Sequence, residues 1–185
     1  MPYFHQSDNE TNDGTGDGRV NGNVMCQLTS LAMVLASKGI RTKDPSVQLE
    51  DELYKMAKEA DYGYEKKKHI WDNVPEMYNE ILEKNFYSSN LESNTLNTDK
   101  NLINIISQID SGNPVIVDIL FYYGGHVIVC IGYTNNALIF HDPYGNLNSG
   151  QNNKYGTDRN GAFVEYQKNK YSIGKRWIKE ITKRK

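Results

Sequence analysis

Cys26 is the first residue of this chain whose type and position suggest chemistry. It follows a polar segment, residues 7–24, and opens the sequence CQLTSLAMVLASKG, in which apolar residues occupy nearly every face. That pattern predicts a buried helix that ends with Gly39 as its C-cap. The N–H groups and the dipole at the start of a helix favour the thiolate form of a cysteine. We therefore expect Cys26 to be a nucleophile, with a small buried core residue as the alternative.

A histidine and an aspartate are expected to meet at one end of a predicted hairpin. His126 opens the apolar run HVIVCIGY, and Asp142 ends the next run, ALIFHDP, after a turn at Asn135-Asn136. Folding the chain back at this turn places His126 beside the segment that begins at Asp142. His141 is adjacent to Asp142, so a regular strand would point the two side chains to opposite faces. The pattern therefore favours His126 as the ring that Asp142 orients.

These residue types together are the parts of an acyl-transfer site. A thiolate attacks a carbonyl, an imidazole moves the proton, and a carboxylate fixes the imidazole. An oxyanion donor would complete the set, and the side-chain amide of Gln6, in PYFHQSDN, is a candidate. By itself Gln6 would be read as an ordinary surface residue.

The rest of the chain predicts the elements that hold these residues. Amphipathic periodicity predicts three more helices, at residues 47–60, 74–84 and 99–110. After residue 113 the pattern changes to strand-like runs, at residues 114–121, 126–133, 137–143, 162–166 and 175–181. We expect a single α+β domain over residues 1–185, with a helical lobe that precedes an antiparallel sheet.

Composition excludes several classes of function. The 21 basic residues against 23 acidic ones give no net positive field for nucleic acid. No apolar run is long enough to span a membrane, and the first 20 residues do not resemble a signal peptide. Two cysteines do not make a disulfide framework or a zinc motif. A monomer is expected.

Four segments, in this order, resemble papain-like cysteine peptidases (clan CA) of the bacteriocin-processing-peptidase-like family: YFHQSDNE, CQLTSLAMVLASKGI, GGHVIVCIGY and HDPYG. The resemblance implies a papain-like fold and a cysteine peptidase. It also implies four roles: nucleophile Cys26, general base His126, orienting carboxylate Asp142 and oxyanion donor Gln6. No cofactor or metal is required for this chemistry.

One position departs from the common form of the family. Many members have Gly-Pro after the cysteine, whereas this chain has Gln27-Leu28, although Thr29-Ser30 after them fits the pattern. The departure bears on the shape of the substrate site more than on the chemistry.

Similar proteins include processors of exported peptides and enzymes that cleave the cell wall. Three features favour an endolysin-like hydrolase of bacterial peptidoglycan peptides, from a bacterium or a phage: no signal or membrane segment, long polar loops, and a basic C-terminal segment. It would act in the cytoplasm or, after release, at the bacterial envelope. The alternatives are a general peptide-processing peptidase, a transpeptidase or acyltransferase, and a binding module without activity.

Other candidates have simpler explanations. Cys130 lies about 13 Å along the strand from His126 at the usual rise, which favours a core position. Acidic residues near Asp13 and Asp17 could bind calcium, but without the EF-hand spacing a solvated loop is favoured. The basic runs at residues 66–68 and 174–185 are interpreted as solvated faces. Three tyrosines near the proposed site could line a groove: Tyr122, Tyr123 and Tyr144.

Overall fold

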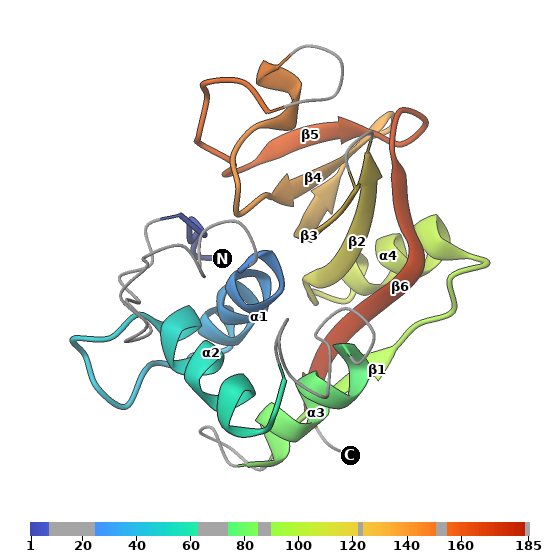
Figure 1. Ribbon diagram of the computed structural model, residues 1–185. Coiled ribbons are helices and arrows are strands. Elements are labelled where there is room, and N and C mark those ends of the chain that lie inside the picture. The colour runs from blue at the N-terminus through green and yellow to red at the C-terminus, as the bar shows by residue number, and fades with distance from the viewer. Residues whose placement is uncertain (8–24, 63–73, 85–89, 122–123, 151–154, 184–185) are drawn as a thin grey trace.

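The computed structural model describes residues 1–7, 25–62, 74–84, 90–121, 124–150 and 155–183. Its elements follow in the order α1 (Cys26–Ser37), α2 (Leu49–Glu59), α3 (Val74–Glu83), β1 (Leu91–Thr95), α4 (Asn101–Asp110), β2 (Val115–Phe121), β3 (Gly124–Tyr133), β4 (Ala137–His141), the 3-10 helix η1 (Leu147–Ser149), β5 (Val164–Gln167) and β6 (Ser172–Lys183). Figure 1 shows α1, α2 and α3 gathered in one lobe, with α1 next to the sheet.

The described strands form one sheet in the order β1-β6-β2-β3-β4-β5, and all neighbouring strands are antiparallel. The predicted hairpin is present in it: Val129 lies opposite His141, and the Thr134 N–H donates to the Ala137 carbonyl at 2.9 Å across the turn. The α+β architecture expected from the sequence is therefore confirmed.

Helices cover both faces of this sheet. Along β3, Val127 and Val129 belong to the core that includes α1, α2 and α3, whereas Ile128 and Cys130 belong to a second core that includes Ile105 of α4. A strand that is buried on both faces is apolar throughout, which explains the continuous run that the sequence shows. The fourth helix thus lies on the other face of the sheet from α1, and not in a lobe with the first three.

All four predicted helices form, but strand β1 was not predicted. Its sequence, LESNT, has little of the β-branched and aromatic character typical of strands. It becomes a strand because it pairs with the C-terminal half of β6, with Leu91 opposite Lys183 and Thr95 opposite Lys179. Within the described part of the chain, none of the helices combines the length and hydropathy needed to cross a bilayer.

The interpretation of the C-terminal basic segment as a solvated face is wrong for Lys179. Lys179 is buried and donates to the Thr95 hydroxyl, and burial lowers its pKa to about 8 against the opposing charge of Glu76. The Arg176 Nε donates to the buried Asp118 carboxylate at 2.9 Å. The Arg176 side chain is nevertheless 44% exposed, so it stays on a solvated face while it binds Asp118. The basic run at residues 66–68 lies outside the described residues.

Candidate active site

Cys26 begins α1, and a hydrogen bond near the start of this helix ties it to the sheet. Cys26 is 2% exposed. One turn later, the Ser30 hydroxyl donates to the Val127 carbonyl at 3.1 Å. Val127 is the neighbour of His126 on β3, so this bond fixes the start of the helix against the strand that carries the imidazole.

Tyr78 of α3 contacts the first turn of α1 from the helical lobe. Its hydroxyl donates to the Gln27 carbonyl at 3.2 Å. Burial, and then the charge of Cys26, raise the pKa of Tyr78 well above its ordinary value. The Gln27 side chain, at the position that departs from the common family pattern, is buried and makes no hydrogen bond with the described part of the chain.

His126 and Asp142 form a buried pair. His126 Nε2 lies 2.8 Å from Asp142 Oδ1, and the two side chains are 8% and 0% exposed. Burial lowers the pKa of His126, but the charges of Asp142 and Cys26, with hydrogen bonds to both, raise it to about 10. Because Nε2 binds Asp142, the hydrogen bond between His126 and Cys26 uses the other ring nitrogen, Nδ1.

Gln6 is held next to this pair by the N-terminal segment. The Gln6 N–H donates to the Pro143 carbonyl at 2.8 Å, and the Gln6 side chain is 1% exposed. Tyr3 lies earlier in the same segment. Its hydroxyl donates to the Asp142 carbonyl at 3.0 Å and accepts from the Gly161 N–H at 3.0 Å. The segment therefore binds the loop that follows Asp142 at two points, and Gln6 is a buried residue, not a surface one.

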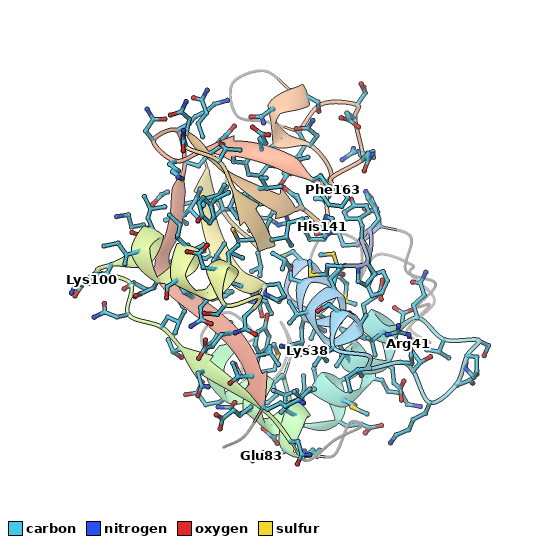
Figure 2. All side chains as sticks on the ribbon, turned by 180° about the vertical axis from the view of Figure 1, so that it is seen from behind. Lys38, Arg41, Glu83, Lys100, His141 and Phe163 are labelled. Carbon is cyan, nitrogen blue, oxygen red and sulfur yellow. The ribbon has the colours of Figure 1, made fainter. Side chains whose placement is uncertain are left out.

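His141 belongs to a different environment. Its Nδ1 accepts from the Phe163 N–H at 3.3 Å, its Nε2 lies 3.3 Å from the Met1 carbonyl, and burial lowers its pKa. Figure 2 shows the His141 and Phe163 side chains next to each other, and their ring centroids are 4.7 Å apart. The parity argument from the sequence, which pairs Asp142 with His126 and turns His141 away, agrees with these contacts.

Two tyrosine rings pack against the His126 imidazole. The Tyr144 and Tyr155 ring centroids lie 6.4 Å and 5.8 Å from that of His126, both edge to face. Tyr144 thus lines the site as the sequence suggested, while Tyr122 and Tyr123 lie outside the described residues. Tyr155 and Tyr166 were not singled out from the sequence, because the chain has 13 tyrosines with no local pattern to distinguish these two.

The remaining candidates separate clearly from the site. Cys130 is fully buried in the second core, and burial raises its pKa to about 12. Both cysteines are free thiols. The acidic residues suggested for calcium fall outside the described residues, and among those described no three His, Cys, Asp or Glu side chains are grouped to hold a metal ion.

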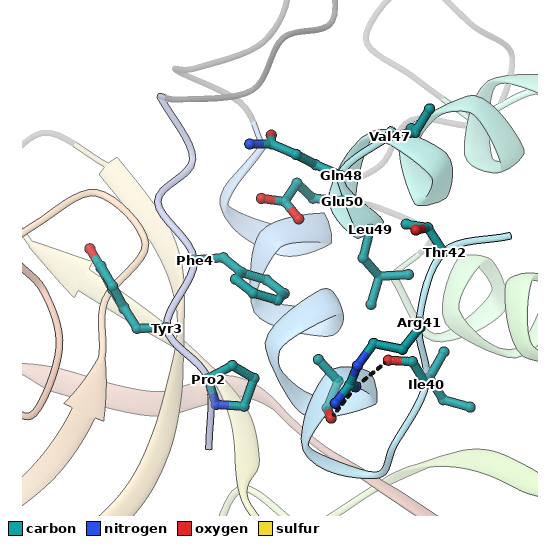
Figure 3. Close-up of a pocket in the computed structure, with 11 residues that line it drawn as sticks. Pro2, Tyr3, Phe4, Ile40, Arg41, Thr42, Val47, Gln48, Leu49 and Glu50 are labelled. Carbon is teal, nitrogen blue, oxygen red and sulfur yellow. Dashed lines mark hydrogen bonds between the residues drawn. The ribbon is translucent and has the colours of Figure 1, made fainter. Parts of the chain in front are cut away.

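A separate pocket of about 420 Å³ lies at the other end of α1. Figure 3 shows Phe4 and Leu49 on its apolar side, and Arg41 donating to the carbonyls of Ala36 and Ile40. Its lining contains neither Cys26, His126 nor Asp142.

A cysteine at a helix start beside an imidazole and a carboxylate from an antiparallel sheet is the arrangement of the papain-like cysteine peptidase class. The family model described as "Peptidase_C39 like family" matches residues 1–175. The chain therefore belongs to the C39-like peptidase family, within the papain-like clan CA.

A solved structure supports the fold. A crystal structure described as that of a C39-like peptidase from Bacillus anthracis matches with a TM-score of 0.52 and 18% sequence identity, over 98% of this chain and 94% of that one. At this identity the likeness concerns the fold alone. A search of curated proteins finds no match.

Proposed function

We propose that this chain is a cysteine peptidase that hydrolyses an amide bond through Cys26, His126 and Asp142. The observation that carries the proposal is the position of His126, which binds Asp142 through one ring nitrogen and interacts with Cys26 by a hydrogen bond and by charge. Membership of a peptidase family supports the same reaction class.

The first half of the reaction makes an acyl-enzyme. Since the pKa of His126 is raised to about 10, its ring is an imidazolium at neutral pH. A neighbouring cation of this kind favours the thiolate form of a cysteine, which is the nucleophile. The sulfur attacks the carbonyl carbon and forms a C–S bond, while the carbonyl electron pair moves onto oxygen. The Gln6 amide and the N–H groups at the start of α1 donate to that oxyanion. His126 Nδ1 then gives its proton to the leaving amine as the C–N bond breaks.

The second half consumes water. Neutral His126 takes a proton from a water molecule as its oxygen attacks the thioester carbonyl. Collapse of the tetrahedral intermediate breaks the C–S bond, releases a carboxylic acid and restores the thiolate and the imidazolium. Asp142 keeps the ring in place through both halves.

For the substrate we propose amide bonds of bacterial peptidoglycan, in stem peptides or cross-bridges. The support is the hydrophilic composition of the loop that follows Asp142, in which residues 145–150 read GNLNSG and residues 155–161 read YGTDRNG. Such a loop suits a polar glycopeptide. The basic C-terminal segment lends less support than its composition suggests, because Lys179 is buried and Arg176 is paired with Asp118.

Incubation with purified sacculi tests this function. The proposal predicts new free amino groups, without new reducing sugar ends, from the wild type and not from Cys26→Ala. Sacculi of several wall types that stay intact while a peptide library is cleaved would refute the wall substrate and keep the peptidase. Diversion of the product by an added amine would identify a transferase instead.

A further inference from the structure

Asp142 is a fully buried carboxylate with a donor in every direction. Four groups of the described chain donate to it. Oδ1 accepts from the His126 ring at 2.8 Å and from the Tyr144 N–H at 2.9 Å. Oδ2 accepts from two phenol hydroxyls, those of Tyr155 at 2.8 Å and Tyr166 at 2.7 Å. The oxygen that faces away from the imidazole is thus held by tyrosines alone.

Tyr166 reaches Asp142 from the core. It lies on β5, is completely buried, and packs against the rings of Phe140 and Tyr171 with centroids 5.4 Å and 5.3 Å away. Its oxygen accepts from the Leu147 N–H at 3.1 Å. A phenol hydroxyl has one proton to donate, and the acceptor nearest to the Tyr166 hydroxyl is Asp142 Oδ2. The hydroxyl is therefore fixed as a donor to the carboxylate.

Tyr155 reaches the same oxygen from the loop and also contacts the imidazole. Its ring stands edge to face with His126 at 5.8 Å and an interplanar angle of 81°, and lies 4.7 Å from the Tyr144 ring. It therefore contacts both members of the His126–Asp142 pair. These two contacts restrict the rotation of the imidazole ring.

We propose that Tyr155 and Tyr166 are positioning residues, a two-hydroxyl clamp that keeps the Asp142 carboxylate ionised and oriented so that it can orient His126. The inference rests on the proposed function, since it assigns the clamp to that same site. Neither hydroxyl touches the reacting atoms, so the clamp acts through Asp142.

The physical reason is the cost of an isolated charge in a buried site. A carboxylate removed from water takes up a proton unless hydrogen bonds favour its charged form. Burial and the charge of Asp142 raise the pKa values of Tyr155 and Tyr166 far above the ordinary phenol value, so both remain proton donors. Among the described residues, the titratable groups that contact the Asp142 carboxylate are these two phenols and His126 on β3. Cys26 at the start of α1 interacts with His126 and with Tyr155.

Single and double Tyr→Phe variants test the clamp, because they remove only an oxygen atom. Tyr155→Phe and Tyr166→Phe should each lower kcat about tenfold, and the double variant about a hundredfold, with KM little changed. The acid limb of the kcat/KM profile should move to higher pH, because a carboxylate that has lost a donor takes up a proton more readily. The control is Tyr171→Phe, whose hydroxyl donates to Asn148 and not to Asp142.

A purely structural role would give a different pattern. Wild-type kcat and an unmoved acid limb in both folded single variants would overturn the clamp, and so would losses no larger than those of Tyr171→Phe. Tyr155→Phe keeps the test decisive if Tyr166→Phe folds poorly, because only Tyr166 is part of the core and accepts from the Leu147 N–H.

A second measurement needs no substrate. The rate at which iodoacetamide alkylates Cys26 reports on the thiolate–imidazolium pair at each pH. The clamp predicts that the acid limb of this rate moves to higher pH in Tyr155→Phe, and an unmoved limb would overturn it. If the wild type cleaves no peptide while this shift is observed, the proposed function fails and the clamp stands.

Discussion

His126 Nε2 lies 2.8 Å from Asp142 Oδ1, and this contact leaves Nδ1 as the ring nitrogen that interacts with Cys26. In the proposed mechanism, proton transfer to the leaving amine therefore uses Nδ1, because Nε2 is bound to the carboxylate. The carboxylate is in turn fixed by donors on both oxygens. The site is thus a chain of contacts that runs from β5 through Asp142 and His126 to the start of α1.

His126 and His141, both buried, should respond differently to truncation. His126→Ala should lower kcat/KM by about 10³-fold or more, because it removes the group that moves the proton. His141→Ala should mainly cost stability, about 1–2 kcal/mol, because its contacts are with Met1 and Phe163. Steady-state kinetics with thermal unfolding of both variants makes the comparison. An inactive His141→Ala beside an active His126→Ala would contradict the assignment.

The charge of Asp142 should set the alkaline limit of activity. The pKa of His126 is raised to about 10, so the imidazolium persists below this pH and is lost as the pH rises through it. The alkaline limb of kcat/KM is therefore expected near pH 10. Asp142→Asn keeps an acceptor for Nε2 but removes the charge, and the limb should fall by about one to three pH units. An alkaline limb that is the same in both proteins would show that Asp142 does not stabilise the imidazolium.

The two cysteines should differ in reactivity at neutral pH. Burial raises the pKa of Cys130 to about 12, so at pH 7 only about one molecule in 10⁵ carries its thiolate. Cys26 interacts with the His126 imidazolium and should be alkylated first by iodoacetamide. Peptide mapping of the folded protein after timed labelling measures the order. Equal labelling, or Cys130 first, would argue against Cys26 as the nucleophile.

Gln6 should matter for rate more than for folding. If its amide donates to the oxyanion, Gln6→Ala should lower kcat by about 10²- to 10³-fold. Its backbone bond to Pro143 does not depend on the side chain, so thermal unfolding should change little. Tyr3→Phe is the control for the N-terminal segment, since it removes the hydroxyl that binds the Asp142 carbonyl without touching the amide. Full activity in Gln6→Ala would assign the oxyanion to the helix N–H groups alone.

The hairpin and the helix behind Cys26 were predictable because both depend on local patterns. The apolar runs of β3 and β4 and the turn at residues 135–136 bring Asp142 to His126, and the apolar sequence after Cys26 marks a buried helix. The tyrosines that hold Asp142 were not predictable, since residues 155 and 166 reach it only once β5 has paired with β4. Strand β1 and the buried Lys179 were missed for the same reason, because each depends on a partner far along the chain.

The central claim is that Cys26 is the nucleophile of an amide-cleaving site. Mass spectrometry of a peptide and peptidoglycan-fragment library tests it most directly, after incubation with the wild type, Cys26→Ala and the matched control Cys130→Ala. The account predicts the same new amide-cleavage products from the wild type and from Cys130→Ala, and none from Cys26→Ala. Undiminished cleavage by Cys26→Ala would contradict it.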